Sequence, residues 1–324
     1  MDWESVDWAA LERLRDVFLR REEAPGPYWQ DAADLESYDF TFGRRIAWKW
    51  SAVLAELIAA GWTPPARTLV DWGCGTAIAA RSMLAHFGAG TIEKVVLWDH
   101  SVAAADLARE TIRARGYEVV VTVADPATHL SGDAFVLVVS HVINELDTTG
   151  RRDLLELATR ASAVIWVEPG TPADSQALID ARDELRKAFH CWFPCPHDGA
   201  CGLRAAGNER HWCHHFARPP TEAFTEGGWA AFGHRIGIDL RSLPYSYLVL
   251  DRREPARLPN GRRIIGRPRE AAGVMQVLRC QAGDVSEVQL QKRDSRSLWK
   301  TLEKGRHPGL LAWQEDNQGR IISG

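Results

Sequence analysis

Short apolar runs that alternate with helical stretches are the feature that most constrains how this chain can fold. An apolar run without polar alternation is typical of a strand that is buried on both faces, and a helix between two such strands makes them parallel. Five of these runs follow Pro64 and Pro65, at residues 68–71, 94–98, 118–123, 134–140 and 163–168. The sequence therefore predicts an α/β fold with a parallel, doubly wound sheet.

The segment before this pattern, residues 1–62, is expected to form an N-terminal helical cap. Apolar residues at helical spacing predict one helix over Trp8–Arg20 and a second from about Gly43 to Ala60. Gly61 follows as a left-handed cap. The stretch between the two helices, through Asp39, is rich in Pro, Gly and Asp and is expected to be a loop.

Two further regions are expected after this helical cap. Residues 63–251 would form the α/β domain, with a Cys-rich insertion at 188–220 and a closing hairpin made of 232–240 and 245–251. Residues 252–324 would form a small β-rich unit. In that unit, 273–279 and 285–291 read as antiparallel strands after a stretch, 252–269, that is dense in helix and strand breakers.

The composition indicates an ordinary soluble globular protein and excludes a disordered chain, since 45% of the residues are hydrophobic and 25% are charged. No apolar run is long enough to span a bilayer, and the acidic start of the chain lacks the features of a secretory signal. We therefore expect a cytoplasmic protein without a membrane partner. The oligomeric state is open, with a monomer favoured. In a reducing compartment its six cysteines favour metal binding over disulfides.

Positive charge is concentrated at the C-terminal end. The chain has a net charge of −4, yet residues 251–324 carry 15 Lys and Arg against 9 Asp and Glu. Most of the basic residues of the chain are arginines, whose planar guanidinium groups suit bidentate contacts with phosphate. A solvated surface would explain the same abundance, so both interpretations stay open.

A glycine-containing loop follows the first apolar run. The strand ends at Asp71, and the turn contains Gly73, Gly75 and Thr76. Ile78 stands where a dinucleotide-binding loop would have its third glycine, which disfavours pyrophosphate binding. The segment 69–76 resembles the first motif of class I methyltransferases. That resemblance implies that Asp71, Gly73, Gly75 and Thr76 bind the donor S-adenosylmethionine.

Acidic residues end the next two apolar runs. Asp99 stands where the resemblance implies a carboxylate that accepts hydrogen bonds from the ribose hydroxyls of the donor, and Asp125 where it implies a position near the adenine. After the fourth run, His141 and Glu145 lie at the sheet edge that holds the reactants in open α/β proteins. They are candidates for acceptor binding or proton removal, with helix capping and core packing as alternatives.

Three cysteines lie within twenty residues of one another: Cys195, Cys201 and Cys213. The spacing lacks the paired C-x-x-C of zinc ribbons, although a zinc site remains an alternative. An irregular, proline-containing loop could instead surround an iron–sulfur cluster. The fourth ligand would be Cys280 or, as the competitor, Cys191.

Several motifs together resemble the methyltransferase-like assembly factors of the mitochondrial small ribosomal subunit and their bacterial relatives. The resemblance runs from about residue 36 to 300. It implies a class I methyltransferase fold, S-adenosylmethionine binding, a four-iron–four-sulfur cluster on Cys195, Cys201, Cys213 and Cys280, and docking on small-subunit ribosomal RNA. The motifs lie at residues 38–39, 43–45, 71–76, 140–146, 168–172, 194–197, 212–214 and 245–247.

The first functional hypothesis is therefore an rRNA methyltransferase that acts in small-subunit assembly. In it the basic C-terminal unit holds the RNA through Arg262, Arg263, Arg267 and Arg269. The second is an assembly and RNA-binding factor that keeps the methyltransferase fold without catalysis. The third is a methyltransferase that acts on a small molecule.

Overall fold

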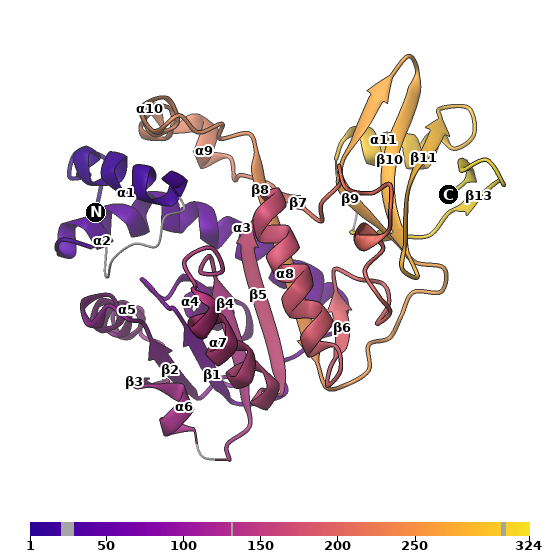
Figure 1. Cartoon of the computed structure of the whole chain (residues 1–324). Coiled ribbons are helices and arrows are strands. Elements are labelled where there is room, and N and C mark those ends of the chain that lie inside the picture. The colour runs from indigo at the N-terminus through magenta and orange to yellow at the C-terminus, as the bar shows by residue number, and fades with distance from the viewer. Residues whose placement is uncertain (21–28, 131, 306–308) are drawn as a thin grey trace. The chain divides into compact units, whose positions relative to one another are not determined.

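The structure is a computed structural model that describes residues 1–20, 29–130, 132–305 and 309–324 (Figure 1). The chain forms two compact units. The first contains residues 1–168 and 217–243, and the second contains residues 169–216 and 244–324. The three regions expected from the sequence divide the chain differently and stay a prediction.

The first unit contains a parallel sheet with the strand order β3-β2-β1-β4-β5. This is the order of doubly wound folds, in which the chain reverses direction across the sheet beside β1. Ligands of such folds bind at the carboxyl ends of the strands, next to that reversal. The doubly wound α/β prediction is confirmed, and the strands are β1 (Thr68–Trp72), β2 (Lys94–Trp98), β3 (Val120–Val123), β4 (Phe135–Ser140) and β5 (Ala163–Pro169).

Helices follow the first four strands in turn: α4 (Ile78–Phe87), α5 (Val102–Ala114), α6 (Pro126–His129) and α7 (Thr148–Arg160). The residue before α5, Ser101, accepts a hydrogen bond from the amide of Ala104, and the residue before α7, Asp147, accepts one from the amide of Gly150. These are N-caps, which satisfy amides that the first turn of a helix leaves free. The helices α5 and α7 therefore have defined starting points.

The helical part of the first unit comprises α1 (Trp8–Arg20), α2 (Ala32–Tyr38), the π-helix η1 (Asp39–Gly43), α3 (Arg44–Ala59), α9 (Glu222–Thr225) and α10 (Gly227–Ile236). The predicted helices α1 and α3 are confirmed, and Gly61 has the expected positive φ of 74°. The predicted loop before Asp39 contains α2, which begins after the N-cap Asp31.

The strand predicted at 232–240 is wrong, because most of this segment belongs to α10. Trp229, Phe232 and Ile236 are three and four residues apart, so they share one helical face. They are buried in a cluster with Leu11 of α1 and Phe42 of η1. Apolar content alone suggested a strand, whereas the spacing of the large side chains is helical.

The second unit contains α8 (Pro172–Leu185), a group of strands around β8, and a separate C-terminal sheet. β8 (Leu243–Asp251) pairs antiparallel with β6 (His190–Phe193) and also pairs with β7 (His215–Ala217). The C-terminal sheet has the order β12-β9-β10-β11-β14-β13. Its elements are β9 (Arg262–Ala271), β10 (Val274–Gln281), β11 (Asp284–Gln291), α11 (Arg296–Glu303), β12 (Leu310–Leu311), β13 (Gln314–Glu315) and β14 (Arg320–Ser323).

The predicted antiparallel pair 273–279 and 285–291 is confirmed as β10 and β11. The breaker-rich stretch before it nevertheless ends in the long strand β9. The pairing of β9 with β10 shifts register between Gln276 and Leu278, opposite Gly266 and Pro268. A bulge accommodates proline and glycine in a strand, which explains why the breakers did not prevent it.

Among the helices of the described residues, none is at once long enough and apolar enough to cross a bilayer.

Candidate donor site and cysteine cluster

The loop after β1 depends on a glycine at position 73. Gly73 has a φ of 66°, and a Cβ built on it would lie 2.6 Å from Cγ1 of Val142. A side chain is therefore excluded both by backbone conformation and by space. At Gly75, where φ is 49°, a Cβ would meet nothing within 4 Å. The loop thus packs tightly against the residues after β4 and leaves open space at Gly75.

Asp99 connects the end of β2 to this loop. Its Oδ2 accepts a hydrogen bond of 2.8 Å from the amide of Gly75, and its Oδ1 accepts one of 2.8 Å from the amide of Ser101. Only 7% of its side chain is exposed. Each carboxylate oxygen can accept a further hydrogen bond, so Asp99 could still receive the hydroxyls of a ribose placed over Gly75.

Asp71 holds the start of α4. It is buried, and its Oδ2 accepts a hydrogen bond of 2.9 Å from the amide of Ala80 in the first turn of that helix. In the part of the chain that the structure describes, its Oδ1 has no hydrogen-bond partner. Burial raises the pKa of Asp71 to about 8. Among the predicted donor residues, Asp71 thus shapes the loop and also offers one unused polar atom.

Thr76 connects the loop to the helical part of the same unit. Its hydroxyl donates a hydrogen bond of 2.6 Å to Oδ1 of Asp39, and Asp39 also forms an ion pair with Arg81 of α4. Residues 38–39 belong only to one motif of the resemblance, and no motif predicted a role for Arg81. The sequence carried little signal for these contacts, because Asp39 is 37 residues from Thr76 and 42 residues from Arg81.

His141 is brought close to the helical part of the first unit. Its Nε2 lies 3.0 Å from Nζ of Lys49 in α3, and its Nδ1 lies 3.3 Å from Oγ of Ser140. Burial and the charge of Lys49 hold the pKa of His141 well below its usual range. The imidazole is therefore neutral and accepts a hydrogen bond from Lys49, which leaves it poorly placed to remove a proton.

Glu145 lies in the same loop but is exposed. Burial raises the pKa of Tyr38, and the charges of Glu145, Asp39 and Asp99 raise it further, so Tyr38 lies within electrostatic range of all three carboxylates. The structure thus gathers the end of α2, the loop after β4 and the acid after β2 around one place. Glu145 is the titratable member of this group that faces solvent.

Glu168 supports that loop from the end of β5. Its Oε1 accepts hydrogen bonds from the amides of Val142 and Ile143, at 3.2 and 3.1 Å, and from the indole of Trp166. Glu168 was not among the predicted site residues. A buried glutamate at the end of an apolar strand was the available signal, because such a charge needs several donors.

Asp125 follows β3 and is exposed. Its Oδ1 accepts a hydrogen bond of 2.8 Å from the amide of Ala127, so it is the N-cap of α6. The structure places it at the carboxyl ends of the strands with Asp71 and Asp99, and its contact with adenine stays a prediction.

In the second unit, Cys195 has two polar neighbours. Nε of Arg182 donates a hydrogen bond of 3.1 Å to its Sγ. The hydrogen bond from Cys191, together with Arg182, lowers the pKa of Cys195. Cys191 and Arg182 therefore both favour the ionised form of Cys195.

The other three predicted metal ligands lie within electrostatic range of Cys195. Burial, followed by the charges of Cys195, Cys201 and Cys280, raises the pKa of Cys213. Burial raises the pKa of Cys280 to about 12, with further contributions from Cys195 and Cys201. Cys201 and Cys213 pack on a buried cluster that contains Cys280. The four predicted ligands therefore lie within electrostatic range of one another.

Thiols in a buried, shared environment are chemically suited to a soft metal ion or an iron–sulfur cluster. Within the described residues, however, no group of three or more His, Cys, Asp or Glu side chains is spaced to hold a metal ion. The donor chemistry is therefore present without a formed coordination geometry.

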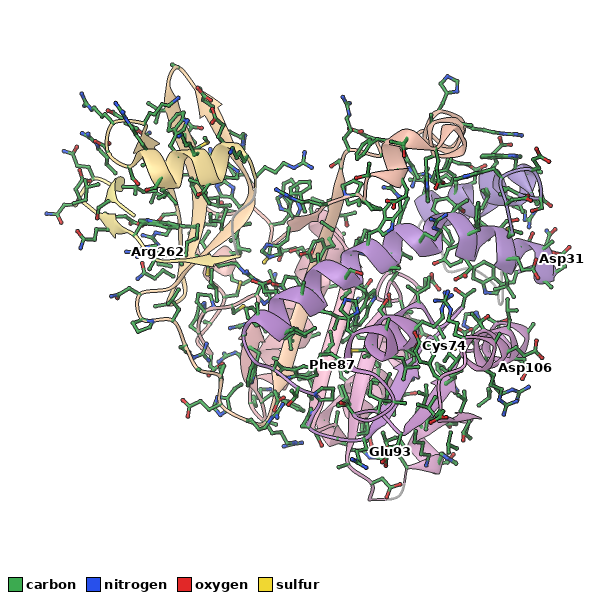
Figure 2. All side chains as sticks on the ribbon, turned by 180° about the vertical axis from the view of Figure 1, so that it is seen from behind. Asp31, Cys74, Phe87, Glu93, Asp106 and Arg262 are labelled. Carbon is green, nitrogen blue, oxygen red and sulfur yellow. The ribbon has the colours of Figure 1, made fainter. Side chains whose placement is uncertain are left out.

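The predicted RNA-binding arginines separate into two pairs. Arg263 is 1% exposed and donates to the carbonyl of Pro194 at 3.0 Å, and Arg262, labelled in Figure 2, donates to the carbonyl of Trp313 at 2.6 Å. Arg267 and Arg269 are exposed. The prediction of a four-arginine surface is wrong for Arg262 and Arg263, because their guanidinium groups satisfy buried carbonyls.

The strand order, the loop at Gly73 and Gly75, and the acid after β2 define a class I methyltransferase-type protein. The model of the family "Mitochondrial small ribosomal subunit Rsm22" matches residues 44–307. The chain belongs to this family.

Solved methyltransferase structures resemble the chain more distantly. The N-methyltransferase NodS from Bradyrhizobium japonicum, in complex with S-adenosylhomocysteine, is 10% identical with a TM-score of 0.40, over 75% of this chain and 100% of that chain. An rRNA methylase from Escherichia coli is 14% identical with a TM-score of 0.35, over 58% of this chain and 71% of that chain. No curated protein is significantly similar to the chain.

Proposed function

We propose that this chain binds S-adenosylmethionine over the loop between β1 and α4 and methylates small-subunit ribosomal RNA during assembly of the subunit. The observation that carries the donor site is the hydrogen bond between the amide of Gly75 and Asp99. It places a carboxylate beside open backbone at the switch point of the sheet, where doubly wound folds bind nucleotides. Membership of the ribosomal family supports the RNA partner.

The residues around this loop would position the reactants. The donor supplies an electrophilic methyl group on its sulfonium, so alignment of an acceptor with that group could provide much of the catalysis. Asp99 would orient the ribose, and the loop that Glu168 holds would line the acceptor side. Tyr38 and Glu145, which lie within electrostatic range of each other, are the candidates to contact the acceptor.

We propose further that Cys195, Cys201, Cys213 and Cys280 hold a four-iron–four-sulfur cluster, with zinc as the alternative. The mutual electrostatic range of the four thiols supports this ligand set. Cys280 contributes to the electrostatic environment of Cys213, which supports Cys280 as the fourth ligand. The cluster would hold the structure of the second unit together.

Calorimetry with S-adenosylhomocysteine tests the donor site. The parent protein should bind it, and Asp99→Ala should weaken binding about tenfold or more, since hydrogen bonds to a charged group contribute roughly 1.5–3 kcal/mol. Asp106→Ala, on the surface of α5, is the matched control and should bind like the parent. Unchanged binding by Asp99→Ala would remove the donor site from this loop.

Transfer of a labelled methyl group then tests catalysis. With the parent protein, small-subunit rRNA should become labelled, both as deproteinised RNA and in assembly intermediates. With a variant that cannot bind the donor, no label should be transferred. A label that appears only on small metabolites would assign the third hypothesis instead.

One observation favours the second candidate, an assembly factor without catalysis. Nε2 of His141 is engaged by Lys49, so the histidine of the acceptor side is not available as a base. Donor binding and rRNA binding without any transfer of label would establish that function.

A further inference from the structure

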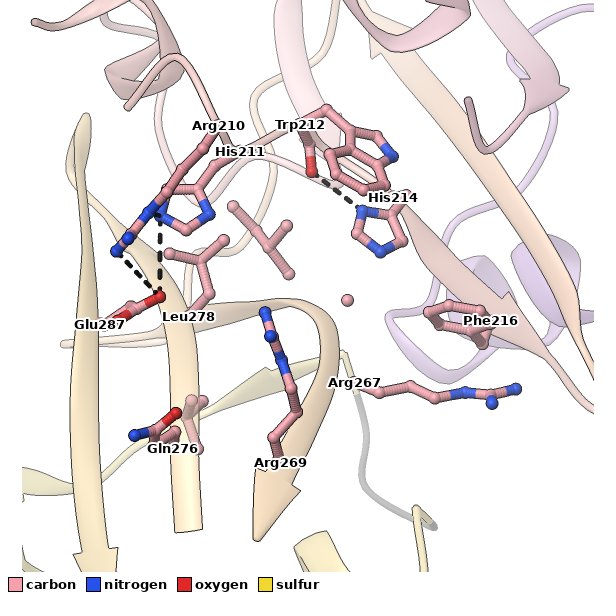
Figure 3. A pocket seen from close by; sticks show the side chains of 13 residues that line it. Arg210, His211, Trp212, His214, Phe216, Arg267, Arg269, Gln276, Leu278 and Glu287 are labelled. Atoms are coloured by element: carbon pink, nitrogen blue, oxygen red, sulfur yellow. Dashed lines mark hydrogen bonds and ion pairs between the residues drawn. The ribbon is translucent and has the colours of Figure 1, made fainter. Parts of the chain in front are cut away.

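The second unit contains a pocket of about 360 Å³ that the proposed donor site and the thiols do not use (Figure 3). The segment before and within β7 forms one side of it, and β9, β10 and β11 supply the rest. Its volume lies within the range of about 300–1,000 Å³ that is typical of ligand pockets. It is therefore large enough for one planar ring system.

Aromatic rings at alternate positions form one side of this pocket: Trp212, His214 and Phe216. The rings of Trp212 and His214 stack with centroids 4.5 Å apart, and those of His214 and Phe216 meet edge to face at 5.4 Å. Because the positions alternate, the residues between these rings, Cys213 and His215, belong to the opposite face of the segment. We call these three rings the aromatic stripe.

Local contacts hold the aromatic stripe in place. The indole of Trp212 donates to the carbonyl of Gly170, and Nδ1 of His214 lies 3.0 Å from the carbonyl of Trp212. Gly266, with a φ of 69°, donates its amide to the carbonyl of His214, and a Cβ on it would lie 3.0 Å from the imidazole. A glycine is therefore needed for β9 to approach the ring, which shows that the pocket wall is built tightly.

The other side of the pocket is basic and polar. In Figure 3 the side chain of Arg269 extends into the pocket, while Arg267 lies beside Phe216, with its guanidinium carbon 4.0 Å from the ring centroid. Gln276 lines the same side. Among the lining residues, Glu287 is the acidic one, and Arg210 pairs with it at 3.2 Å. With Arg210 and Glu287 paired, the remaining charged residues that line the pocket, Arg267 and Arg269, are positive.

We propose that this pocket binds one unpaired nucleotide of single-stranded RNA, with the base between the aromatic stripe and Arg269 and the flanking phosphates at Arg267 and Arg269. Unpaired bases stack on aromatic rings and guanidinium planes, and an amide such as that of Gln276 can hydrogen-bond a base edge. The inference rests on the proposed function, because it names the part of the chain that contacts the RNA. A base-paired nucleotide would not fit, since its base is stacked inside a helix.

Fluorescence anisotropy with a labelled, unstructured RNA of about twelve nucleotides tests the proposal on the full-length protein purified anaerobically. The parent should bind this RNA more tightly than the same sequence in a duplex. Phe216→Leu and Arg269→Gln should each weaken binding to the single strand at least about fivefold, the lower end of the range measured for loss of one base–aromatic stack. Arg293→Gln, an exposed arginine of the same unit, removes the same charge and should change affinity less than twofold.

Photo-cross-linking locates the base directly. RNA that carries 4-thiouridine should cross-link to residues 212–216, and thermal unfolding should show that Phe216→Leu is folded like the parent. Cross-links that map elsewhere, or parent-like affinity of both pocket variants, would overturn the pocket and leave rRNA binding intact. Equal loss in Arg269→Gln and Arg293→Gln would mean general charge attraction and would also overturn it.

Two further outcomes separate this inference from the proposed function. If the parent bound no RNA at all, the rRNA partner itself would be refuted together with the pocket. If Phe216→Leu weakened binding to intact small subunits but not to protein-free rRNA, the pocket would bind a ribosomal protein, and the nucleotide assignment would be wrong.

Discussion

At the scale of single residues, the loop between β1 and α4 depends on residues that contact backbone groups or make room for a neighbouring side chain. Gly73 makes room for Val142, Asp71 accepts from the amide of Ala80, and Asp99 accepts from the amide of Gly75. None of these contacts depends on a donor molecule being present. Substitutions at these positions should therefore alter the stability of the loop as well as its binding.

Gly73→Ala should destabilise the protein and abolish donor binding. The substitution forces a left-handed conformation on alanine and a contact of 2.6 Å with Val142, and strain of this kind costs about 1–3 kcal/mol. Urea unfolding and calorimetry with S-adenosylhomocysteine measure the two effects. Gly90→Ala is the matched control. Gly90 is exposed and lacks a positive φ, and a Cβ built on it would meet nothing within 4 Å. Equal stability of the two variants would contradict the role assigned to Gly73.

Asp71→Asn should stabilise the protein progressively more as pH rises. Burial raises the pKa of Asp71 in the folded state to about 8, far above that of an unfolded aspartate. Between about pH 4 and pH 8 the unfolded chain releases this proton and the folded chain keeps it, so the parent loses stability across that window. The amide oxygen of asparagine can still accept from Ala80 and carries no titrating charge.

Within that window, the free energy of unfolding of Asp71→Asn relative to the parent should rise by at most about 1.4 kcal/mol per pH unit. Above the window the difference should level off. Urea unfolding at pH 5, 6.5 and 8 measures it. Asp106→Asn, on the surface of α5, should show no comparable trend (Figure 2). A pH-independent difference would mean that Asp71 is ionised in the folded protein.

At the scale of elements, β10 brings a distant cysteine to the irregular segment that carries the other three. Cys280 is 67 positions after Cys213 in the chain, yet both lie at one buried cluster. Cys191 lies in β6 and Cys195 lies two residues after its end, where Arg182 of α8 donates a hydrogen bond to Sγ of Cys195. A metal bound at these thiols would join α8, β6 and the C-terminal sheet within the second unit.

Cys280→Ser should release iron and lower the temperature of unfolding, because metal binding to the folded ligands contributes to folding free energy. Cys191→Ser is the matched control and should retain iron, since Cys191 is outside the proposed ligand set. Iron, sulfide and zinc analysis of anaerobically purified protein measures both. Stoichiometric zinc without iron would replace the cluster by zinc, and full iron in Cys280→Ser would place the fourth ligand elsewhere.

At the scale of the whole molecule, burial distinguishes arginines that stabilise the fold from arginines that are available to bind RNA. Arg262 pairs with Glu315 and packs on Trp313, and Arg263 packs on Phe193 and Tyr247, so these two belong to the interior. Arg267 and Arg269 face solvent. Binding of rRNA should therefore respond to the second pair, and folding to the first.

Affinity for small-subunit rRNA should fall steeply as salt rises, because arginines that contact phosphates release counterions. Reversing Arg267 and Arg269 to Glu should flatten the slope of log affinity against log salt by roughly 1.4–1.8, which corresponds to about two phosphates. Reversing Arg293 and Arg296, both exposed on the same unit, is the control with equal charge and should leave the slope nearly unchanged. Equal slopes in the two double variants would place the RNA elsewhere.

The sequence by itself determined the elements whose signals are local. The five apolar runs became the parallel strands, helical spacing placed α1 and α3, and the strand and glycine turn of residues 69–76 became β1 and the loop before α4. Burial of an apolar strand or helix face depends mainly on its own periodicity, so these features could be read from neighbouring residues.

Only the tertiary structure decided which side chains meet across long separations. The contact of Thr76 with Asp39, the occupation of His141 by Lys49 and the burial of Arg262 and Arg263 each depend on packing between segments far apart in the chain. The same holds for β9, which needs a bulge in its pairing with β10 to tolerate Pro268. No periodicity encodes such contacts, because the partners of a buried polar group are set by the fold that surrounds it.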